Sequence, residues 1–354
     1  MARFKKIAVL TSGGDAPGMN AVIRAIVRCA EDAGVDVCAI YEGYEGLLKG
    51  NIKDLTQRDV SNIIQRGGTM LYSARCLDFK EEWAMQKAIE TCKAEGIEGI
   101  VAIGGDGTFK GARDLCQRGM PCIGVPGTID NDITATEYTI GCDTALNTSV
   151  EMIDKLRDTC DSHRRCSVVE VMGRSTVSLP LQIGIAVGAS AILVPGYDYD
   201  FDKIAERIKA QAESGKRNFV VIVSEGLKGV GQALAEHIEK YAGVESRYTQ
   251  LGHVVRGGSP TVKDRVTASQ MAAKAVELLL AGESNKVICQ HSDRIDVYPI
   301  DYALDMDALY RGKKTAEDYK DKYSEEEISA MLDYCAKRNA WLKEFYDLNE
   351  ALTK

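Results

Sequence analysis

The chain has 354 residues, a length that corresponds to about two domains of ordinary size. Hydrophobic residues make up 45% and charged residues 27% of the sequence, and the net charge is −8. This composition is typical of globular proteins and provides no globally basic surface for nucleic acid or for an anionic membrane. The longest apolar runs are also far shorter than the ~18 residues that cross a bilayer. We therefore expect neither a nucleic-acid partner nor a membrane partner.

Short apolar runs alternate with helical patterns along most of the chain. The expected strands cover residues 6–10, 35–41, 97–103, 121–125, 166–172, 188–196 and 218–226, and the segment 246–254 looks extended. The expected helices cover residues 19–34, 81–96, 107–119, 140–160, 201–214, 229–242 and 261–282, with a further helix that starts near Ser324. This alternation predicts β-α-β units with parallel sheets, which bind ligands at loops beyond the carboxyl ends of their strands.

The eleven cysteines follow no metal-binding or disulfide pattern. No pair has the C-x-x-C spacing, and Cys289 and His291 have no further candidate ligands nearby. A zinc site is therefore disfavoured. Because the sequence also shows no signal peptide, we expect reduced thiols and a cytoplasmic protein.

The first loop that suggests chemistry is TSGGDAPGMN, at 11–20. Gly13 and Gly14 allow backbone amides to approach an anion closely, and the following helix points its N-terminus at the same place. A tight β-α turn without a ligand is the alternative interpretation. The loop lacks the G-x-G-x-x-G pattern of dinucleotide sites, and the chain contains no P-loop motif.

The second loop is IGGDGTF, at 103–109. Its glycines clear space for phosphate groups, and Asp106 offers a hard oxygen ligand to Mg²⁺. Thr108 can cap the following helix and donate to a phosphate. The alternative is a capped turn in which Asp106 only accepts hydrogen bonds from backbone amides.

The third loop, PGTIDND at 126–132, places two carboxylates around one amide. Asp130 could act as a general base, Asp132 could position it or hold a metal-bound water, and Thr128 could contact a transferred group. An Asx-rich turn is the alternative, because Asp and Asn are common in turns.

These three loops occur in order together with RGGTMLYSARC (66–76), LRDTCDSHRRCSVVEVMGR (156–174) and LGHVVRGGSPTVKDR (251–265). In this combination the sequence resembles the phosphofructokinase family over roughly residues 4–300, and in particular its bacterial ATP-dependent 6-phosphofructokinases. The resemblance implies two Rossmann-like three-layer α/β/α domains with mostly parallel sheets and an active site in the cleft between them. The expected division is a nucleotide-binding domain at 1–140, rejoined by part of the C-terminal third, a sugar-phosphate domain at 141–300 and a helical C-terminal extension at 301–354 that packs on the core.

The resemblance also implies an enzyme that phosphorylates D-fructose 6-phosphate at the 1-hydroxyl in glycolysis, with ATP as donor and Mg²⁺ as cofactor. The catalytic residues would be Gly14, Thr128, Asp130, Asp132 and Arg174. ATP would be bound by Gly14, Arg75, Cys76, Gly105, Asp106, Gly107 and Thr108, with Asp106 on the metal.

The sugar-phosphate site implied by the resemblance consists of Thr128, Ile129, Asp130, Arg165, Met172, Gly173, Arg174, Glu225, Arg247, His253, Val254, Val255 and Arg256. Arg165 and Arg247 would reach into the site of a neighbouring subunit, which implies a homotetramer. Gly107 and Gly127 would select ATP, because relatives that use pyrophosphate carry Asp and Lys at these two positions.

The chain also departs from the family pattern. Val177 replaces a common glycine close to Arg174, which could shift the loop that carries this arginine. The implied effector site, with cations Arg24, Arg28, Arg157 and Lys216, is incomplete at Gln57, Gly196 and Ser214. These departures keep open a non-catalytic regulatory paralogue that binds sugar phosphate or nucleotide. A pyrophosphate-dependent phosphofructokinase is the other alternative, although the two glycines favour ATP.

Overall fold

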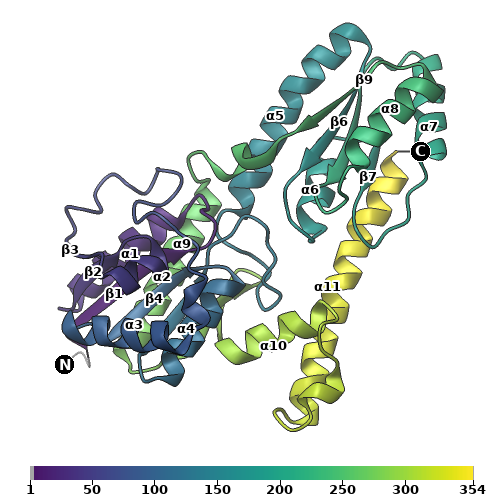
Figure 1. The fold of residues 1–354 in the computed structure, drawn as a ribbon. Coiled ribbons are helices and arrows are strands. Elements are labelled where there is room, and N and C mark those ends of the chain that lie inside the picture. The colour runs from purple at the N-terminus through teal and green to yellow at the C-terminus, as the bar shows by residue number, and fades with distance from the viewer. Residues whose placement is uncertain (1–3, 354) are drawn as a thin grey trace. The chain divides into compact units, whose positions relative to one another are not determined.

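The structure is a computed structural model that describes residues 4–353. The chain divides into two compact units, which are described separately. Unit 1 contains Met1–Thr144 and Arg256–Cys335, and unit 2 contains Ala145–Val255 and Ala336–Lys354. The chain therefore passes from unit 1 to unit 2, returns to unit 1 and ends in unit 2 (Figure 1). Within residues 4–353, every helix is too short or too polar to cross a bilayer.

The sheet of unit 1 is mostly parallel, as the alternating pattern predicts. Its described strands have the order β11-β10-β5-β4-β1-β2-β3. They are β1 (Lys6–Ser12), β2 (Asp36–Ile40), β3 (Ile52–Leu55), β4 (Gly99–Gly104), β5 (Cys122–Pro126), β10 (Lys286–His291) and β11 (Arg294–Pro299). Only the edge strands β3 and β11 pair antiparallel with their neighbours among these strands. The sequence patterns did not reveal β3, β10 or β11.

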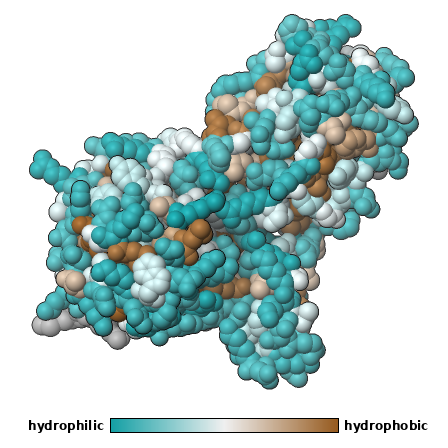
Figure 2. All heavy atoms as spheres, in the orientation of Figure 1, coloured by the Kyte–Doolittle hydropathy of each residue, from teal (hydrophilic) through white to brown (hydrophobic). Residues whose placement is uncertain are grey.

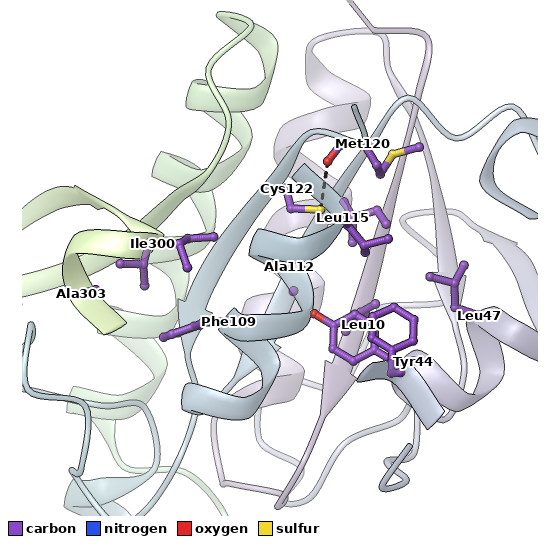
Figure 3. Packing of buried hydrophobic residues seen from close by; sticks show 14 of the residues in the cluster. Leu10, Tyr44, Leu47, Phe109, Ala112, Leu115, Met120, Cys122, Ile300 and Ala303 are labelled. Atoms are coloured by element: carbon purple, nitrogen blue, oxygen red, sulfur yellow. Dashed lines mark hydrogen bonds between the residues drawn. The ribbon is translucent and has the colours of Figure 1, made fainter. Parts of the chain in front are cut away.

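Helices cover both faces of this sheet. They are α1 (Met19–Asp32), α2 (Gly43–Lys49), α3 (Glu82–Ala94), α4 (Asp106–Gln117), α9 (Val262–Leu280) and α10 (Ile300–Tyr310), with short 3₁₀ helices η1 (Asp78–Lys80) and η3 (Ala316–Tyr319). On one face, buried residues of α2, α3, α4 and α10 form a single core with the strands. Figure 3 shows Phe109 of α4 on the side of Ile300 and Ala303 of α10, and Leu115 of α4 beside Cys122 of β5. The helices α1 and α9 pack on each other and on the sheet outside this core, which completes a three-layer unit.

Unit 2 has a smaller sheet of the same kind. Its described strands have the order β7-β8-β6-β9, and every pair is parallel. The strands are β6 (Cys166–Val171), β7 (Ala191–Leu193), β8 (Phe219–Ser224) and β9 (Ser246–Gln250). The helical elements are α5 (Cys142–His163), which begins in unit 1, α6 (Ser178–Ala186), α7 (Phe201–Glu213), α8 (Val230–Ala242) and the 3₁₀ helix η2 (Gly252–Arg256).

The two faces of the unit 2 sheet are covered by different helices. Ile208 of α7 and Leu234 of α8 pack on Phe219 and other strand residues of one face. Cys166 and Val168 of β6 belong to this core. The hydroxyl oxygen of Ser167, which lies between them on β6, is 3.1 Å from the sulfur of Cys160 of α5. Because successive strand residues point to opposite faces, α5 covers the other face.

The last helix, α11 (Glu325–Leu352), takes part in both units. As predicted, it begins next to Ser324, whose hydroxyl accepts from the amide of Glu327 while the Glu327 carboxylate accepts from the amide of Ser324. This reciprocal pair is a capping box. Met331 belongs to the unit 1 core, whereas Tyr346 stacks on Tyr197 of unit 2 with ring centroids 4.2 Å apart. Hydrophilic residues predominate on the face of the molecule seen in Figure 2.

Candidate active site

Three loops begin side by side at the carboxyl edge of the unit 1 sheet. They follow β5, β4 and β1, which are adjacent strands. The register pairs Ser12 with Gly104 and Gly104 with Pro126, so the last residues of these strands are neighbours. Since adjacent strands are about 4.8 Å apart, the sheet brings together the glycine-rich and acidic loops that the sequence analysis singled out.

The first two loops are joined by a direct hydrogen bond. The hydroxyl of Thr108 donates to the carbonyl oxygen of Ser12, with 3.0 Å between the oxygens. A Cβ on Gly104 would lie 2.3 Å from Oγ1 of Thr108 and 2.4 Å from the Ser12 oxygen, so only glycine permits this approach. The expectation that Thr108 caps the helix is wrong. The N-cap of α4 is Gly105, because the helix already begins at Asp106.

Arg256 lies against the first loop. A Cβ on Gly14 would be 3.4 Å from Nη1 of Arg256, which places the guanidinium beside the backbone of this glycine. The adjacent Gly13 has φ +89°, a left-handed conformation that favours glycine. Two residues with separate predicted roles, the phosphoryl contact Gly14 and the 6-phosphate ligand Arg256, are thus neighbours in unit 1.

Asp106 occupies the first turn of α4 with about a third of its side chain exposed. Burial disfavours its ionised form, but Lys110, the amide of Gly107 and Arg311 outweigh burial and hold the pKa of the carboxyl below its ordinary value. The ammonium of Lys110 lies 3.1 Å from Oδ2 of Asp106. The sequence analysis did not name Lys110, although its position four residues after Asp106 on a helix is a usual sign of such a pair.

The donor set around Asp106 fits a metal that is held mainly by a substrate. No group of three or more His, Cys, Asp and Glu side chains could form a metal site by itself within residues 4–353. Mg²⁺ is usually bound through one or two carboxylates together with substrate phosphates and water. A single ionised carboxylate at a helix N-terminus therefore fits Mg²⁺ bound with a nucleotide better than a structural metal.

The PGTIDND loop is organised around its amide residue. Asn131 adopts φ +48°, and its side-chain amide donates to the carbonyl of Glu137 over 3.1 Å. The hydroxyl of Thr139 donates to the carbonyl of Thr128 over 2.6 Å. The turn interpretation thus describes Asn131, which shapes the loop, while the flanking Asp130 is buried to 2% exposure. Asp130 is thus a buried carboxylate in a loop whose shape its neighbour Asn131 sets.

Arg311, at the end of α10, contacts this loop and was not identified from the sequence. Its Nη2 donates to the carbonyl oxygen of Asp132 over 2.7 Å and lies 3.5 Å from Oδ2 of the same residue. The two residues are 179 positions apart. No local pattern could have indicated the contact, because it depends on how α10 packs on the sheet.

The two glycines that were expected to select the donor have different surroundings. A Cβ on Gly107 would meet no other atom within 4 Å, so the position opens onto free space beside the N-terminus of α4. A Cβ on Gly127 would lie 3.0 Å from Ile103 and 3.2 Å from Met19, both apolar side chains. A side chain is therefore sterically accepted at 107, whereas at 127 it requires movement of the core.

Arg75 and Cys76 lie on a segment that is tied to the first loop. The hydroxyl of Ser73 donates to the carbonyl of Gly13 over 2.6 Å. Arg75 is exposed and Cys76 is half-buried. Burial and a hydrogen bond with Glu45 raise the pKa of the Cys76 thiol to about 11, so it is protonated at neutral pH.

The carboxyl edge of the unit 2 sheet carries the second set of predicted residues. Met172, Gly173 and Arg174 follow β6, Glu225 follows β8, and His253, Val254 and Val255 follow β9. His253 and Val254 are exposed, whereas Val255 is buried. Oε1 of Glu225 accepts from the backbone amides of Gly173 and Arg174, at 3.0 and 2.6 Å. The Glu225 carboxylate therefore fixes the loop that presents Arg174.

Val177 does not strain this loop. It is the N-cap of α6 with φ −101° and ψ −9°, values that any residue adopts. The shift that was considered for the Arg174 loop thus has no basis in the backbone at position 177. Arg174 itself has φ +52°, a left-handed conformation.

Arg165 and Arg247 lie at the opposite, amino edge of the unit 2 sheet. Arg165 immediately precedes β6, and Arg247 is the second residue of β9, paired with Ser167. Both arginines form ion pairs with Glu245, which is 2.8 Å from Nε of Arg165. Because a six-residue strand spans about 20 Å, these two arginines and the Arg174 loop occupy different ends of unit 2.

The four expected effector cations belong to different units. Arg24 and Arg28 lie on α1 of unit 1, whereas Arg157 and Lys216 belong to unit 2. Arg157 donates to the carbonyl of Val187 and to the side chain of Asn218. The ammonium of Lys216 contacts Ser190 and Gln211.

Comparison with known proteins identifies the family of the chain. The family model described as Phosphofructokinase matches residues 6–279. ATP-dependent 6-phosphofructokinases from Lysinibacillus sphaericus and Natranaerobius thermophilus are 52% and 53% identical over 302 and 285 residues, which cover 85% and 80% of this chain and 94% and 89% of those proteins. The solved structure of phosphofructokinase from Saccharomyces cerevisiae has a TM-score of 0.83 and 32% identity, covers 98% of this chain and is matched over 50% of its own chain, so the present chain spans half its length. On these matches, the chain belongs to the phosphofructokinase family.

Proposed function

We propose that this protein transfers the γ-phosphoryl group of ATP to the 1-hydroxyl of D-fructose 6-phosphate and releases fructose 1,6-bisphosphate and ADP, as a step of glycolysis. The observation that carries the proposal is the start of the three loops side by side at one sheet edge, with the buried Asp130 in the third of them. Relatives that are about half identical and are matched over most of their length are named ATP-dependent 6-phosphofructokinases, which supports both the reaction and the donor.

Asp130 acts in this proposal as the general base. A sugar hydroxyl is a weak nucleophile, and a carboxylate within hydrogen-bond reach makes its oxygen reactive by accepting the proton. Phosphoryl transfer otherwise depends on positioning and on balancing the charge of the transferred group. Gly14 and Thr128 supply contacts to that group from unit 1, Arg174 supplies a positive charge from unit 2, and Asp132 positions the base.

ATP is the proposed donor because of Gly107. The free space at its missing Cβ, beside the N-terminus of α4, suits the phosphates of a nucleotide. Arg75, Cys76, Gly105 and Thr108 complete the proposed nucleotide site. Gly127 supports the same donor, since a lysine there would have to displace Ile103 and Met19.

Members of the family depend on a divalent metal, and we propose Mg²⁺ held by Asp106. The carboxyl of Asp106 ionises readily, because Lys110 and Arg311 hold its pKa low in spite of burial. Bound there together with phosphate oxygens, the ion would neutralise part of their negative charge. In the absence of the ion, Lys110 balances the charge of Asp106.

Unit 2 and Arg256 form the proposed sugar-phosphate site. Arg256 and His253 bind the 6-phosphate, for which an arginine fork is better suited than lysine. Met172 and Glu225 contact the sugar. The remaining proposed contacts come from the backbone around these groups and from the third loop, at Ile129, Gly173, Val254 and Val255.

We propose a homotetramer in which Arg165 and Arg247 bind the 6-phosphate in a neighbouring subunit. Their place at the amino edge of the unit 2 sheet, away from the Arg174 loop of the same chain, supports this role. In this chain both guanidinium groups pair with Glu245, and Arg247 also lies 3.7 Å from Glu239.

The effector site and the compartment are proposed on narrower grounds. The cations available for an anionic effector are Arg24, Arg28, Arg157 and Lys216, of which Arg157 and Lys216 already contact backbone and side-chain oxygens.

The two units have separate proposed roles. Unit 1, apart from the helices α10 and α11, provides the nucleotide site, and unit 2 provides the sugar-phosphate site. A cytoplasmic location agrees with the state of the eleven cysteines, all of which are free thiols in the described chain.

The decisive experiment measures product formation from fructose 6-phosphate with ATP and with pyrophosphate as separate donors, each with Mg²⁺. Turnover with ATP and its absence with pyrophosphate supports the proposal. Turnover only with pyrophosphate would transfer the assignment to that donor, and no turnover with either would leave a binding protein without this activity.

A further inference from the structure

The C-terminal end of α10 is fastened to the acidic third loop through Arg311. Nη2 of this arginine donates to the carbonyl oxygen of Asp132 over 2.7 Å and lies 3.5 Å from the Asp132 carboxylate. Only 5% of the Asp132 side chain and 24% of the Arg311 side chain are exposed. The contact is therefore largely shielded from water, where a charge-assisted hydrogen bond is stronger than at an open surface.

Arg311 is itself held in place by Asp307, one helical turn earlier on α10. Nε of Arg311 is 2.7 Å from Oδ2 of Asp307, whose side chain is 10% exposed. Oδ1 of the same carboxylate accepts from the hydroxyl of Thr134 over 2.8 Å. Asp307 thus joins Arg311 to Thr134, two residues beyond Asp132. The end of the loop is attached to α10 at two points, by Asp307 to Thr134 and by Arg311 to Asp132.

The charges around Arg311 indicate more than a structural clamp. Asp307 and Asp132 face its guanidinium, and Asp106 at the N-terminus of α4 is close enough for a favourable electrostatic interaction. Burial disfavours the charged guanidinium, but these carboxylates outweigh it and raise its pKa above the ordinary value. Asp106 and Asp132 belong to different loops and both have proposed roles in the reaction. One half-buried cation at the C-cap of α10 therefore interacts with acidic residues of two loops at once.

We propose that Arg311 is a positioning residue, which holds the Asp130–Asp132 loop against α10 and balances the negative charge at this sheet edge so that Asp130 is directed at the sugar hydroxyl. The proposal rests on the proposed phosphotransferase function for the role of Asp130. The side-chain contacts of Arg311 are with Asp132 and Asp307, and its interaction with Asp106 is electrostatic, so its proposed effect on the reaction acts through these carboxylates. With this role for Arg311, α10 contributes to the proposed reaction, although it lies outside the loops that carry the predicted chemistry.

The first test compares Arg311→Ala, Arg311→Lys and the wild type in the fructose 6-phosphate and ATP assay. A displacement of the base loop by about 1 Å corresponds to a loss of about 10²-fold in kcat, so we expect kcat of Arg311→Ala to fall by this order while KM for ATP changes little. Arg311→Lys keeps the charge but lacks the guanidinium that reaches both Asp132 and Asp307. We expect its kcat to lie between those of Arg311→Ala and the wild type. Lys313→Ala removes an equal charge from an exposed residue two positions away and should behave like the wild type.

The second test is independent of turnover. Hydrogen–deuterium exchange of the amides in residues 128–136 reports how firmly the loop is held. We expect faster exchange in this segment for Arg311→Ala, which removes the attachment to Asp132. We expect it also for Asp307→Ala, which removes the bond to Thr134 and the support of Arg311. Exchange in Lys313→Ala should be unchanged. The double variant Arg311→Ala/Asp307→Ala should exchange no faster than Asp307→Ala, because that single substitution already frees both attachments.

These outcomes separate the two proposals. Wild-type kcat together with wild-type exchange in Arg311→Ala overturns the positioning role. A loss of kcat in Arg311→Ala without faster exchange in residues 128–136 overturns the claim that Arg311 acts by holding this loop. If the wild-type protein shows no turnover with either donor, the phosphotransferase assignment fails, and the exchange experiment still decides whether Arg311 holds the loop.

Discussion

The carboxylate of Glu225 accepts a hydrogen bond from the backbone amide of Arg174, with 2.6 Å between oxygen and nitrogen. The same oxygen accepts from the amide of Gly173 over 3.0 Å. One side chain at the end of β8 thus fixes the conformation of the loop after β6, in which Arg174 adopts φ +52°. The proposed sugar contact and the proposed phosphoryl contact are therefore coupled within unit 2.

Replacement of Glu225 should reduce turnover through this loop. Glu225→Ala removes a charge-assisted acceptor for two amides, a loss of about 1.5–3 kcal/mol, and frees the loop to move. Glu225→Gln keeps an acceptor oxygen without the charge. We expect kcat to fall about 10²-fold in the alanine variant and clearly less in the glutamine variant, measured at saturating fructose 6-phosphate. Equal losses in the two variants would show that the charge, and not the hold on the loop, is what matters.

Asp130→Asn tests the proposed base. The variant keeps the size of a side chain that is 2% exposed but cannot accept the hydroxyl proton. Loss of a general base corresponds to about 10²–10⁴-fold in turnover, while ATP binding, measured by calorimetry, should be preserved. Asp321→Asn, at an exposed carboxylate outside the loops, is the matched control. Unaltered turnover in Asp130→Asn would remove Asp130 from the mechanism.

Substitutions at Gly107 test the donor. Its missing Cβ faces free space, so Gly107→Ala and Gly107→Asp should both fold. A carboxylate placed where ATP phosphates are proposed to bind repels them, and KM for ATP should rise by at least about 10-fold, corresponding to about 1.4 kcal/mol. Alanine adds less volume and no charge and should have a smaller effect. Unchanged KM for ATP in Gly107→Asp would place the nucleotide elsewhere.

The attachment of α11 to unit 2 predicts a local loss of stability. Tyr346 stacks on Tyr197 with ring centroids 4.2 Å apart, close to the contacts of Arg207 with Thr353 and Glu350. Tyr346→Ala loses an aromatic pair worth about 0.5–1.5 kcal/mol in addition to buried area. We expect a lower denaturation midpoint in urea. Leu352→Ala on the same helix, 63% exposed, should leave the midpoint unchanged.

Asp264 gives a prediction for the pH dependence of stability. Its fully buried carboxylate accepts from Tyr138, Gly141 and Thr144. Burial is the largest influence and raises the pKa of this carboxyl above its ordinary value, although the hydrogen bonds oppose it. The folded protein therefore holds this proton to higher pH than the unfolded chain, and its free energy of unfolding falls as pH rises through that window.

The neutral variant Asp264→Asn should remove this dependence. The asparagine side chain resembles the protonated carboxyl in size and charge, so it lacks the titration. The unfolding free energy of the wild type should exceed that of Asp264→Asn most near pH 4, and the difference should decrease towards pH 7. Urea denaturation of both proteins at several pH values measures this difference. An advantage that widens with pH would show that the hydrogen bonds outweigh burial and hold the pKa low.

The strands and helices that carry the three loops of unit 1 could be predicted, because their signals are local. Apolar runs of strand length alternate with amphipathic helices, and a loop that follows a parallel strand lies at the carboxyl edge. The sequence analysis did not place Arg165 at a sheet edge, although its position immediately before the expected strand 166–172 indicates the amino edge. The strands β10 and β11 were missed, because their surroundings resemble neither a clear alternation nor a long apolar run.

Thr108 shows where local reasoning misplaced a side chain. Its position at the start of the helix expected at 107–119 suggested a helix cap. In the structure α4 starts earlier, and the hydroxyl of Thr108 bonds to Ser12 of the neighbouring strand. The hydroxyl bonds to the carbonyl oxygen of Ser12 instead of capping its own helix, and this partner is available only because the register pairs the ends of β1 and β4.

The sequence by itself determined the chemical groups of this protein and the strand ends at which they stand, because both follow from short-range pattern. The tertiary structure alone decided which distant groups became neighbours. Arg256 reaches Gly14 because the chain returns to unit 1 after β9, and Arg311 reaches Asp132 because α10 packs on the sheet beside α4. Such contacts depend on strand order and helix packing over more than a hundred residues, which no local periodicity encodes.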